Sequence, residues 1–321
     1  MADALAGSLA GCSPPSNAQA LAAPQNAWFV RDALSRFDLS PEGIAAMQRR
    51  PRHRVVQISD IHLLAAGELY PGVDPEERLR AILAELVGVG WAASVVVVSG
   101  DLADRAEPEA YDRLRTILSD AVGLLGAELL VVPGNHDDVA RLRSLVLGLK
   151  PSEDPLDSVV NVDGLRVIGL DSTVPGFDYG ELGDDQLQWL AGELAKPAPD
   201  GTILALHHPP IWSTTPHNEL MALRARGRLA DVIRGTDVML VLSGHTHRTS
   251  AGMLAGIPVW VSPATATVED SLFDRGFRGH VGGGFTCVDV LDPGEVVATY
   301  VPLPGRETVL YEAVLEEPAP R

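Results

Sequence analysis

Residues 55–62 read VVQISDIH, a short apolar run that passes directly into an aspartate and a histidine. The same arrangement recurs in VVVVSGD at 95–101 and in LLVVPGNHD at 129–137. Helical patterns at about 75–87 and 108–124 separate these three runs. Short apolar strands that alternate with helices predict βαβ units and a mainly parallel sheet.

The second half of the chain continues this pattern of strands and helices. A helical pattern covers 184–194, and apolar runs predict four more strands, at 165–170, 203–206, 238–242 and 257–261. This number of strands implies two sheets and an α/β fold.

Two segments near the C-terminus depart from this pattern of alternating strands and helices. Residues 285–302 alternate apolar and polar side chains around Asp292-Pro293-Gly294, which is a turn signal and predicts a closing hairpin. Residues 276–284 are rich in glycine and predict a loop.

The composition excludes several classes of protein. The 321 residues carry a formal net charge of −18, which disfavours binding to nucleic acid polymers or to anionic membranes. No apolar run approaches the roughly 18 residues of a membrane span, so we expect no stable membrane insertion. Two cysteines are too few for a disulfide framework and favour a cytoplasmic setting.

The composition and residue patterns of the chain suggest three parts. Residues 1–50 predict a flexible or helical N-terminal extension, with an amphipathic stretch at 28–37. Leu9–Cys12 matches a bacterial lipoprotein box, but the basic residues and apolar length of a secretory signal are missing before it, so a flexible tail is favoured. The catalytic domain is expected at 51–305 and a C-terminal tail at 306–321.

Residue types that bind metals follow five of the predicted strands. The carboxyl ends of strands in open α/β sheets meet at one edge, so these side chains are expected to converge. Each alone is weak evidence, because an isolated aspartate is usually a helix cap and an isolated histidine is usually structural. Three glycines, Gly100, Gly134 and Gly244, would allow close backbone approach. The candidates are Asp60, His62, Asp101, Asn135, His207, His245 and His247.

Imidazole, carboxylate and amide donors without thiolate suit manganese, iron or zinc. Seven donors are too many for one ion, and two ions that share Asp101 account for all of them. Ions bridged by a carboxylate lie roughly 3.5–4 Å apart, where both can polarise a phosphoryl group and acidify a bridging water to hydroxide. The sequence therefore predicts a dinuclear hydrolytic centre.

Five sequence blocks together resemble the signature of the calcineurin-like metallophosphoesterase superfamily, and residues 50–305 are similar more specifically to its class III cyclic nucleotide phosphodiesterases. The blocks are ISDIH (58–62), GD (100–101), GNHD (134–137), HH (207–208) and GHTH (244–247). The resemblance implies a metallophosphoesterase sandwich of two mixed β-sheets flanked by α-helices. It also implies a homodimer.

The resemblance assigns roles to the candidate residues. Three would hold one ion, usually iron, three would hold the other, often manganese, and zinc or cobalt are alternatives. His136 would not be a ligand but would, with Asn135, stabilise the phosphoryl oxygens, or would protonate the departing alkoxide. The first set is Asp60, His62 and His247, the second is Asn135, His207 and His245, and Asp101 bridges them.

Two neighbours of these residues have alternative roles. Asp137 would either orient His136 or cap the following helix. His208 would point away from His207 along an extended strand, so we interpret it as structural or as a partner of a ligand.

The predicted activity is hydrolysis of 3′,5′-cyclic AMP to 5′-AMP by attack of the metal-bridging hydroxide. The alternative is a phosphodiesterase of broad specificity for 2′,3′-cyclic nucleotides, glycerophosphodiesters or aryl phosphate esters. Specificity would lie in loops whose aromatic side chains either stack on a base or cover the core. These are Trp212, His217, Phe273 and Phe277.

Three other classes are weaker. A nuclease lacks a basic cluster near the motifs. A scaffold of the same fold would have lost ligands, and here every ligand position is filled. A zinc amidohydrolase does not account for the extra histidine in GNHD.

Overall fold

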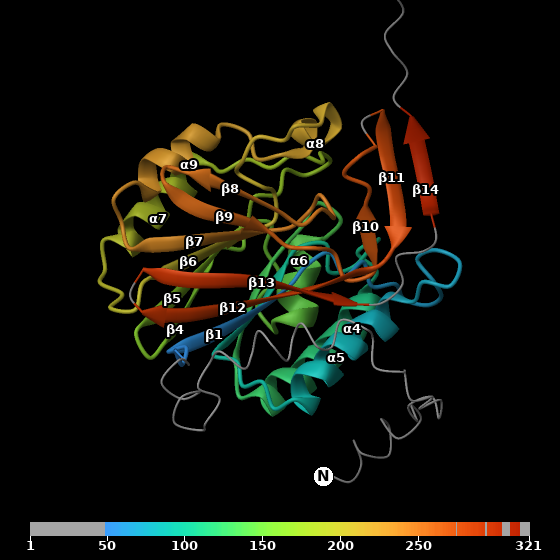
Figure 1. Cartoon of the computed structure of the whole chain (residues 1–321), viewed down its shortest axis with the longest axis horizontal. Coiled ribbons are helices and arrows are strands. Elements are labelled where there is room, and N and C mark those ends of the chain that lie inside the picture. The colour runs from blue at the N-terminus through green and yellow to red at the C-terminus, as the bar shows by residue number, and fades with distance from the viewer. Residues whose placement is uncertain (1–48, 274, 293, 304–308, 315–321) are drawn as a thin grey trace, which may run out of the picture. The chain divides into compact units, whose positions relative to one another are not determined.

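The computed structural model describes residues 49–273, 275–292, 294–303 and 309–314 (Figure 1). All its sheets and helices belong to one unit, Pro51–Arg321. The amphipathic stretch 28–37 and Leu9–Cys12 lie outside the described residues, so the extension at 1–50 stays a prediction.

The first sheet has five strands in the order β13-β12-β1-β2-β3. Strands β1, β2 and β3 are parallel, whereas β12 pairs antiparallel with both β1 and β13, which confirms the closing hairpin. The bounds are β1 His53–Ile58, β2 Val95–Ser99, β3 Glu128–Val132, β12 Gly283–Asp292 and β13 Glu295–Leu303.

The second sheet has six strands in the order β4-β5-β6-β7-β9-β8. The four inner strands are parallel and the two edge strands are antiparallel to their neighbours. The prediction of two mixed sheets is therefore confirmed. The bounds are β4 Ser158–Val162, β5 Leu165–Leu170, β6 Thr202–Leu206, β7 Val238–Ser243, β8 Ser250–Leu254 and β9 Ile257–Val261.

A third, small sheet corrects the prediction of a loop at 276–284. Residues Gly276–Val281 form β11, which pairs antiparallel with β10 (Thr267–Glu269) and β14 (Val309–Val314). Glycine has a poor β-propensity, but pairing with strands on both sides overrides it here. Strand β14 falls within the predicted tail 306–321.

Helices cover the outer face of each large sheet (Figure 1). Side chains alternate along each strand, so Val56 and Val96 pack with α4 and α5, while Val55 and Val95 meet the second sheet in the layer between the sheets. Helices α7 and α9 pack on the far face of the second sheet. The helices are α4 Pro75–Gly88, α5 Pro108–Leu125, α6 Val139–Arg141, a π-helix at Leu142–Val146, α7 Asp184–Leu194, α8 Pro216–Met221 and α9 Arg226–Ile233.

The long helices begin and end where their residue types predict. Asp74 caps α4 by accepting a hydrogen bond from the backbone N–H of Glu76 at 2.8 Å, and Pro75 follows in the first turn. Helix α5 likewise starts at a proline, Pro108, and ends at Gly126, whose φ of 66° only glycine adopts without strain.

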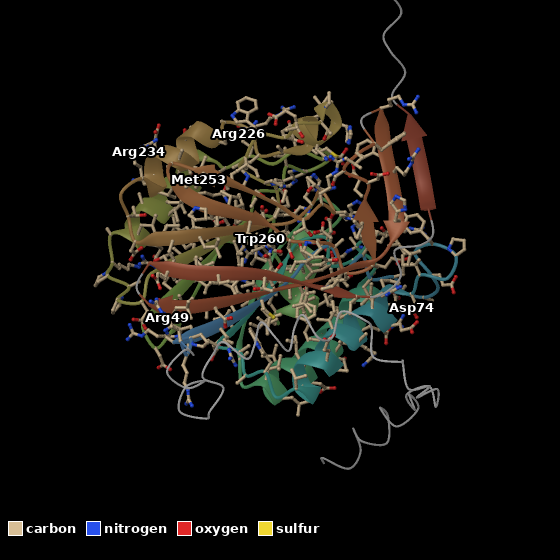
Figure 2. The ribbon with its side chains drawn as sticks, in the orientation of Figure 1. Arg49, Asp74, Arg226, Arg234, Met253 and Trp260 are labelled. Carbon is tan, nitrogen blue, oxygen red and sulfur yellow. The ribbon has the colours of Figure 1, made fainter. Side chains whose placement is uncertain are left out.

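The two large sheets are joined by polar contacts in addition to the apolar layer between them. Trp260 of β9 is labelled in Figure 2. It donates its indole N–H to Thr286 of β12 at 2.9 Å. Gln57 of β1 donates to the carbonyl of Ser243 in β7 at 2.9 Å. The second bond helps to fix the ends of β1 and β7, from which four of the candidate ligands follow. Within the described residues, no helix has the length and apolarity needed to cross a lipid bilayer.

Candidate metal centre

The backbone is unusual at the residues that follow the strands. Nine non-glycine residues of the described part have positive φ angles in the left-handed region, and five of them are predicted ligands. Such a conformation costs about 1–3 kcal/mol per residue and persists only where its surroundings enforce it. Strain of this kind concentrates at functional sites. The five are Asp60 (54°), His62 (52°), Asp101 (50°), His245 (71°) and His247 (50°).

Glycines let these segments come close together, as the sequence predicts. A Cβ atom on Gly100 would lie 2.1 Å from Nδ1 of His207, and one on Gly134 would lie 2.2 Å from Oδ1 of Asp101. A Cβ atom on Gly244 would lie 1.9 Å from the hydroxyl of Ser59, which directly follows β1. Any larger residue at these positions would push the strand ends apart.

Asp60, His62 and His247 form one cluster. Nε2 of His62 lies 3.1 Å from Nε2 of His247, which in turn lies 3.5 Å from Oδ1 of Asp60. The other ring nitrogen of each histidine has its own polar partner. The Asp104 carboxylate lies 3.1 Å from Nδ1 of His62, and the Thr267 hydroxyl lies 2.6 Å from Nδ1 of His247. Such partners orient imidazoles toward a metal.

A second cluster surrounds His207. Its Nε2 lies 3.3 Å from Oδ2 of Asp101 and 3.2 Å from Oδ1 of Asn135, while its Nδ1 donates to the carbonyl of Ser99 at 2.9 Å. His245 is buried, and neither of its ring nitrogens has a hydrogen-bond partner among the residues that the structure describes. Buried polar atoms without partners are rare, and a bound ion is one way to satisfy them. The donor set therefore fits a cation.

Asp101 lies between the two clusters. The oxygen that faces His207 is also 3.7 Å from Nε2 of His62, so one carboxylate atom is close to an imidazole from each cluster. Several groups of side chains here have donor atoms close enough together to hold an ion, including Asp60, Asp101 and His207. The predicted convergence of the strand ends is thus confirmed, whereas the individual ligand roles stay predictions.

Burial and charge set the protonation of these residues. Burial raises the pKa of Asp60, but the His247 hydrogen bond and nearby imidazoles outweigh it and lower the pKa to about 2. Burial lowers the pKa of His245 to about 3, so this imidazole is neutral at pH 7. Burial also opposes the charged form of His207, but the Asp101 carboxylate prevails and raises its pKa to about 9. A cation at His207 would replace a proton.

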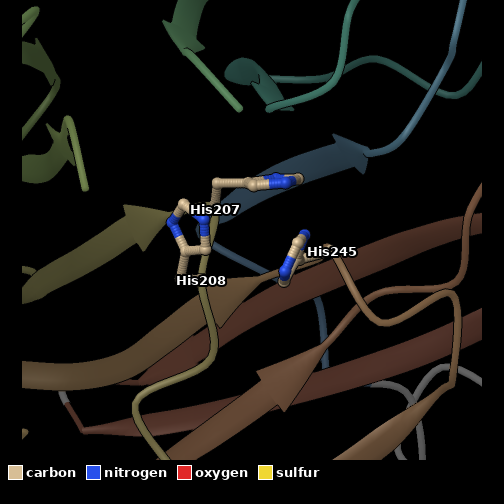
Figure 3. A group of neighbouring side chains, drawn as sticks. All are labelled: His207, His208 and His245. Carbon is tan, nitrogen blue, oxygen red and sulfur yellow. The ribbon is translucent and has the colours of Figure 1, made fainter. Parts of the chain in front are cut away.

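His208 differs from the sequence prediction. Its ring centroid lies only 5.0 Å from that of His207 and 4.7 Å from that of His245 (Figure 3). The prediction that it points away is wrong, because β6 ends at Leu206 and the chain bends before the alternation of a strand applies. Its Nδ1 is paired with the Ser172 hydroxyl at 2.8 Å.

His136 stands at the rim of the clusters, with its side chain 39% exposed. Its Nδ1 donates to the backbone carbonyl of Asp104 at 2.8 Å, and its ring lies edge-on to His62 at 4.8 Å. Burial lowers the pKa of His136, but the Asp101 and Asp104 carboxylates outweigh it and raise the pKa above its usual value. The imidazole is thus biased toward holding a proton.

Asp137 fulfils neither predicted role. Its carboxylate accepts from the backbone N–H groups of Gly134, Leu102 and Ala103 at 2.9–3.1 Å and from the Tyr111 hydroxyl at 3.0 Å. Asp138 instead caps the following helix, α6. Asp137 therefore ties the loop after β3 to the loop after β2.

The clusters open into a cleft of about 310 Å³. In addition to predicted site residues, the walls of the cleft include Leu69, Tyr70, Met221 and Phe277. The sequence indicates Phe277 as a candidate but gives no signal for Leu69, Tyr70 and Met221, which lie in a loop and at the end of α8 without any motif. Asp104, which holds both His62 and His136, was also missed; its position three residues after Asp101 was the only signal.

Comparison with known proteins identifies the family. Residues 53–249 match the model of the calcineurin-like phosphoesterase family. The chain is 45% identical to a "probable cyclic nucleotide phosphodiesterase" of Rhodococcus erythropolis, over 81% of this chain and 87% of the relative. It is 46% identical to a "cAMP/cGMP dual specificity phosphodiesterase" of Mycobacterium tuberculosis, over 83% and 84%.

The fold is also similar to that of a solved structure, described as a dimetal phosphatase from Danio rerio. The TM-score is 0.53 at 14% identity, covering 78% of this chain and all of the other. With the strand-end clusters in place and the family model covering most of the described unit, the chain belongs to the calcineurin-like phosphoesterase family.

Proposed function

We propose that the chain is a dimetal phosphodiesterase that hydrolyses 3′,5′-cyclic AMP to 5′-AMP. The observation that supports this most is the position of the Asp101 carboxylate between the two donor clusters. The relatives at 45% and 46% identity, whose names specify cyclic nucleotides, indicate the substrate class.

The donor set divides into two groups around Asp101. Asp60, His62 and His247 would hold one ion, and a second group would hold the other. When bound, two such ions polarise the phosphoryl group and make a water nucleophilic near neutral pH. We propose iron for the first site and manganese for the second, whose ligands would be Asn135, His207 and His245, with Asp101 shared.

The remaining work falls to the side chains beside the ions. The Asn135 amide would contact a nonbridging phosphoryl oxygen, and the imidazole of His136 would donate a proton to the departing 3′ oxygen. Asp104 supports this role, because its carbonyl accepts from Nδ1 of His136 at 2.8 Å and so fixes the ring. A positioned acid is needed, since an alkoxide of high pKa is a poor leaving group.

Further proposals accompany this function. We propose that the catalytic domain spans 51–305, that the chain forms a homodimer, and that it acts on small phosphodiesters in the cytoplasm. Size-exclusion chromatography with light scattering tests the homodimer directly, and a monomer would contradict it.

A comparison of substrates tests the function. With manganese present, kcat/KM should be at least about tenfold higher for 3′,5′-cyclic AMP than for 2′,3′-cyclic AMP or a glycerophosphodiester, a difference of about 1.4 kcal/mol in transition-state binding. Equal values would indicate the broad phosphodiesterase instead. No hydrolysis of any of these, or of bis(p-nitrophenyl) phosphate, would contradict the enzyme proposal itself.

A further inference from the structure

The walls of the cleft have two chemically different parts. The polar part includes His62, Asp101, His245 and His247 of the clusters, and also Asp178 and Glu269. The other part consists of the apolar side chains of Leu69, Met221 and Phe277, together with the phenol of Tyr70. A diester whose phosphate lies at the clusters can therefore place a substituent against these apolar side chains.

Strand register aims Phe277 into the cleft. In the small sheet, Thr267 pairs with Val281 and Glu269 pairs with Gly279. Since side chains alternate along β11, Phe277 shares a face with these pairs. Thr267 on that face contacts Nδ1 of His247 at 2.6 Å, so the face that carries Phe277 begins at the donor clusters.

A buried network packs against Phe277. The ring of His217 lies 4.4 Å from the ring of Phe277, tilted by 59°. Nε2 of His217 is 3.0 Å from Oε1 of Glu269, and the same oxygen accepts from Arg248 at 2.7 Å. His217, Glu269 and Arg248 are all buried. The aromatic ring therefore rests on a backing that is fixed before any ligand enters.

The other aromatic candidates from the sequence do not line this cleft. Trp212 is 77% exposed beneath the guanidinium of Arg226 and borders a different pocket. Phe273 is buried at 4% exposure and is covered by Arg278, whose guanidinium lies 4.1 Å from its ring. Of the four aromatic side chains considered, only Phe277 is a lining residue.

We infer that Phe277 is a specificity-determining residue: its ring forms the surface on which an aromatic substituent of the diester, such as a purine base, stacks. This inference rests on the proposed function and narrows it to esters that carry an aromatic group. Stacking needs a flat π-face and no particular hydrogen bonds, so it favours purines and aryl groups over glycerol or choline.

Binding of two matched ligands tests the inference without catalysis. 5′-AMP and ribose 5-phosphate share the phosphate and sugar and differ in the base. By calorimetry on the manganese-loaded protein, wild type should bind 5′-AMP at least about fivefold more tightly than ribose 5-phosphate, and Phe277→Ala should remove that preference. Phe277→Tyr, which keeps a π-face, should restore it. Trp212→Ala is the matched control and should behave as wild type.

Kinetics separate this inference from the proposed function. Phe277→Ala should lower kcat/KM for 3′,5′-cyclic AMP at least about fivefold and leave hydrolysis of glycerophosphoethanolamine unchanged. Equal losses on both substrates, or an unchanged ratio of the two ligands in the binding assay, would overturn the role of Phe277 while leaving the phosphodiesterase intact. If wild type hydrolyses neither diester, the proposed function fails, and the binding assay still decides whether Phe277 stacks on the base.

Discussion

Oδ1 of Asp101 accepts a hydrogen bond from the backbone N–H of His136 at 2.9 Å, while Oδ2 of the same carboxylate faces the imidazoles of His207 and His62. One side chain therefore connects the two donor clusters with the residue proposed to donate the proton. Together with the Asp104 carbonyl, which accepts from Nδ1 of His136, this carboxylate fixes the position of His136 relative to the two clusters.

Replacing Asp101 tests its bridging position. We expect Asp101→Ala to lose more than about 100-fold in metal affinity, because changes to partners behind the ligands alone cost about 10–100-fold. Metal content after dialysis, measured by plasma mass spectrometry, checks this. Full retention of both ions in the folded variant would contradict a bridging role.

Replacing His136 should separate metal binding from turnover. We expect His136→Ala to keep the metal content of wild type and to lose about 10²–10⁴-fold in kcat, which is the usual contribution of a general acid. A substrate with an activated leaving group, such as bis(p-nitrophenyl) phosphate, should lose much less, because its phenolate departs without a proton. Metal loss equal to that of Asp101→Ala would refute this division of roles.

The pair of Arg248 and Glu269 should matter for stability. Both side chains are buried and their atoms lie 2.7 Å apart, so Glu269→Ala would leave a buried guanidinium without its carboxylate. We expect a loss of about 3–5 kcal/mol in the free energy of unfolding, measured by urea denaturation.

A surface pair provides the control for that measurement. Arg234 and Asp231 lie 3.9 Å apart with side chains 61% and 81% exposed, so Arg234→Ala should cost at most about 1 kcal/mol. Comparable losses in the two variants would show that the buried network is no stronger than a surface ion pair.

Cys287 should resist alkylation in the native protein. Burial, with the nearby Asp289 carboxylate, raises the pKa of its thiol to about 11, so little thiolate exists at pH 8. In a Cys12→Ser background, we expect iodoacetamide to react more than about 100-fold more slowly with native than with urea-unfolded protein. The native rate should keep rising with pH well above 9. Equal rates in the two states would contradict the raised pKa.

The part of the site that follows from parallel strands could be predicted from the sequence. Parallel strands of one sheet share an edge, so this rule places Asp60 and Asp101 together after β1 and β2, and His207 and His245 together after β6 and β7. The two pairs meet because the two sheets pack face to face. The positions of Gly100, Gly134 and Gly244 also predict that the segments after these strands approach one another closely.

The part that depends on bends and distant pairing could not be predicted. His208 lies beside His245 because the chain bends directly after β6. Pro209 and Pro210 indicate that the strand ends there, but they do not indicate the direction in which the His208 side chain points. Strand β11 forms because β14 pairs with it from residues 309–314, although its own glycines favour a loop. Phe277 therefore enters the cleft through a long-range contact.

The left-handed backbone at five of the candidate ligands has a consequence for ion capture. The unfavourable torsion angles are set when the chain folds, by the strands that precede them and by the glycines that admit their neighbours. An ion that enters the folded site would meet imidazoles and carboxylates already close together, so little of its binding free energy would be lost to rearranging the polypeptide.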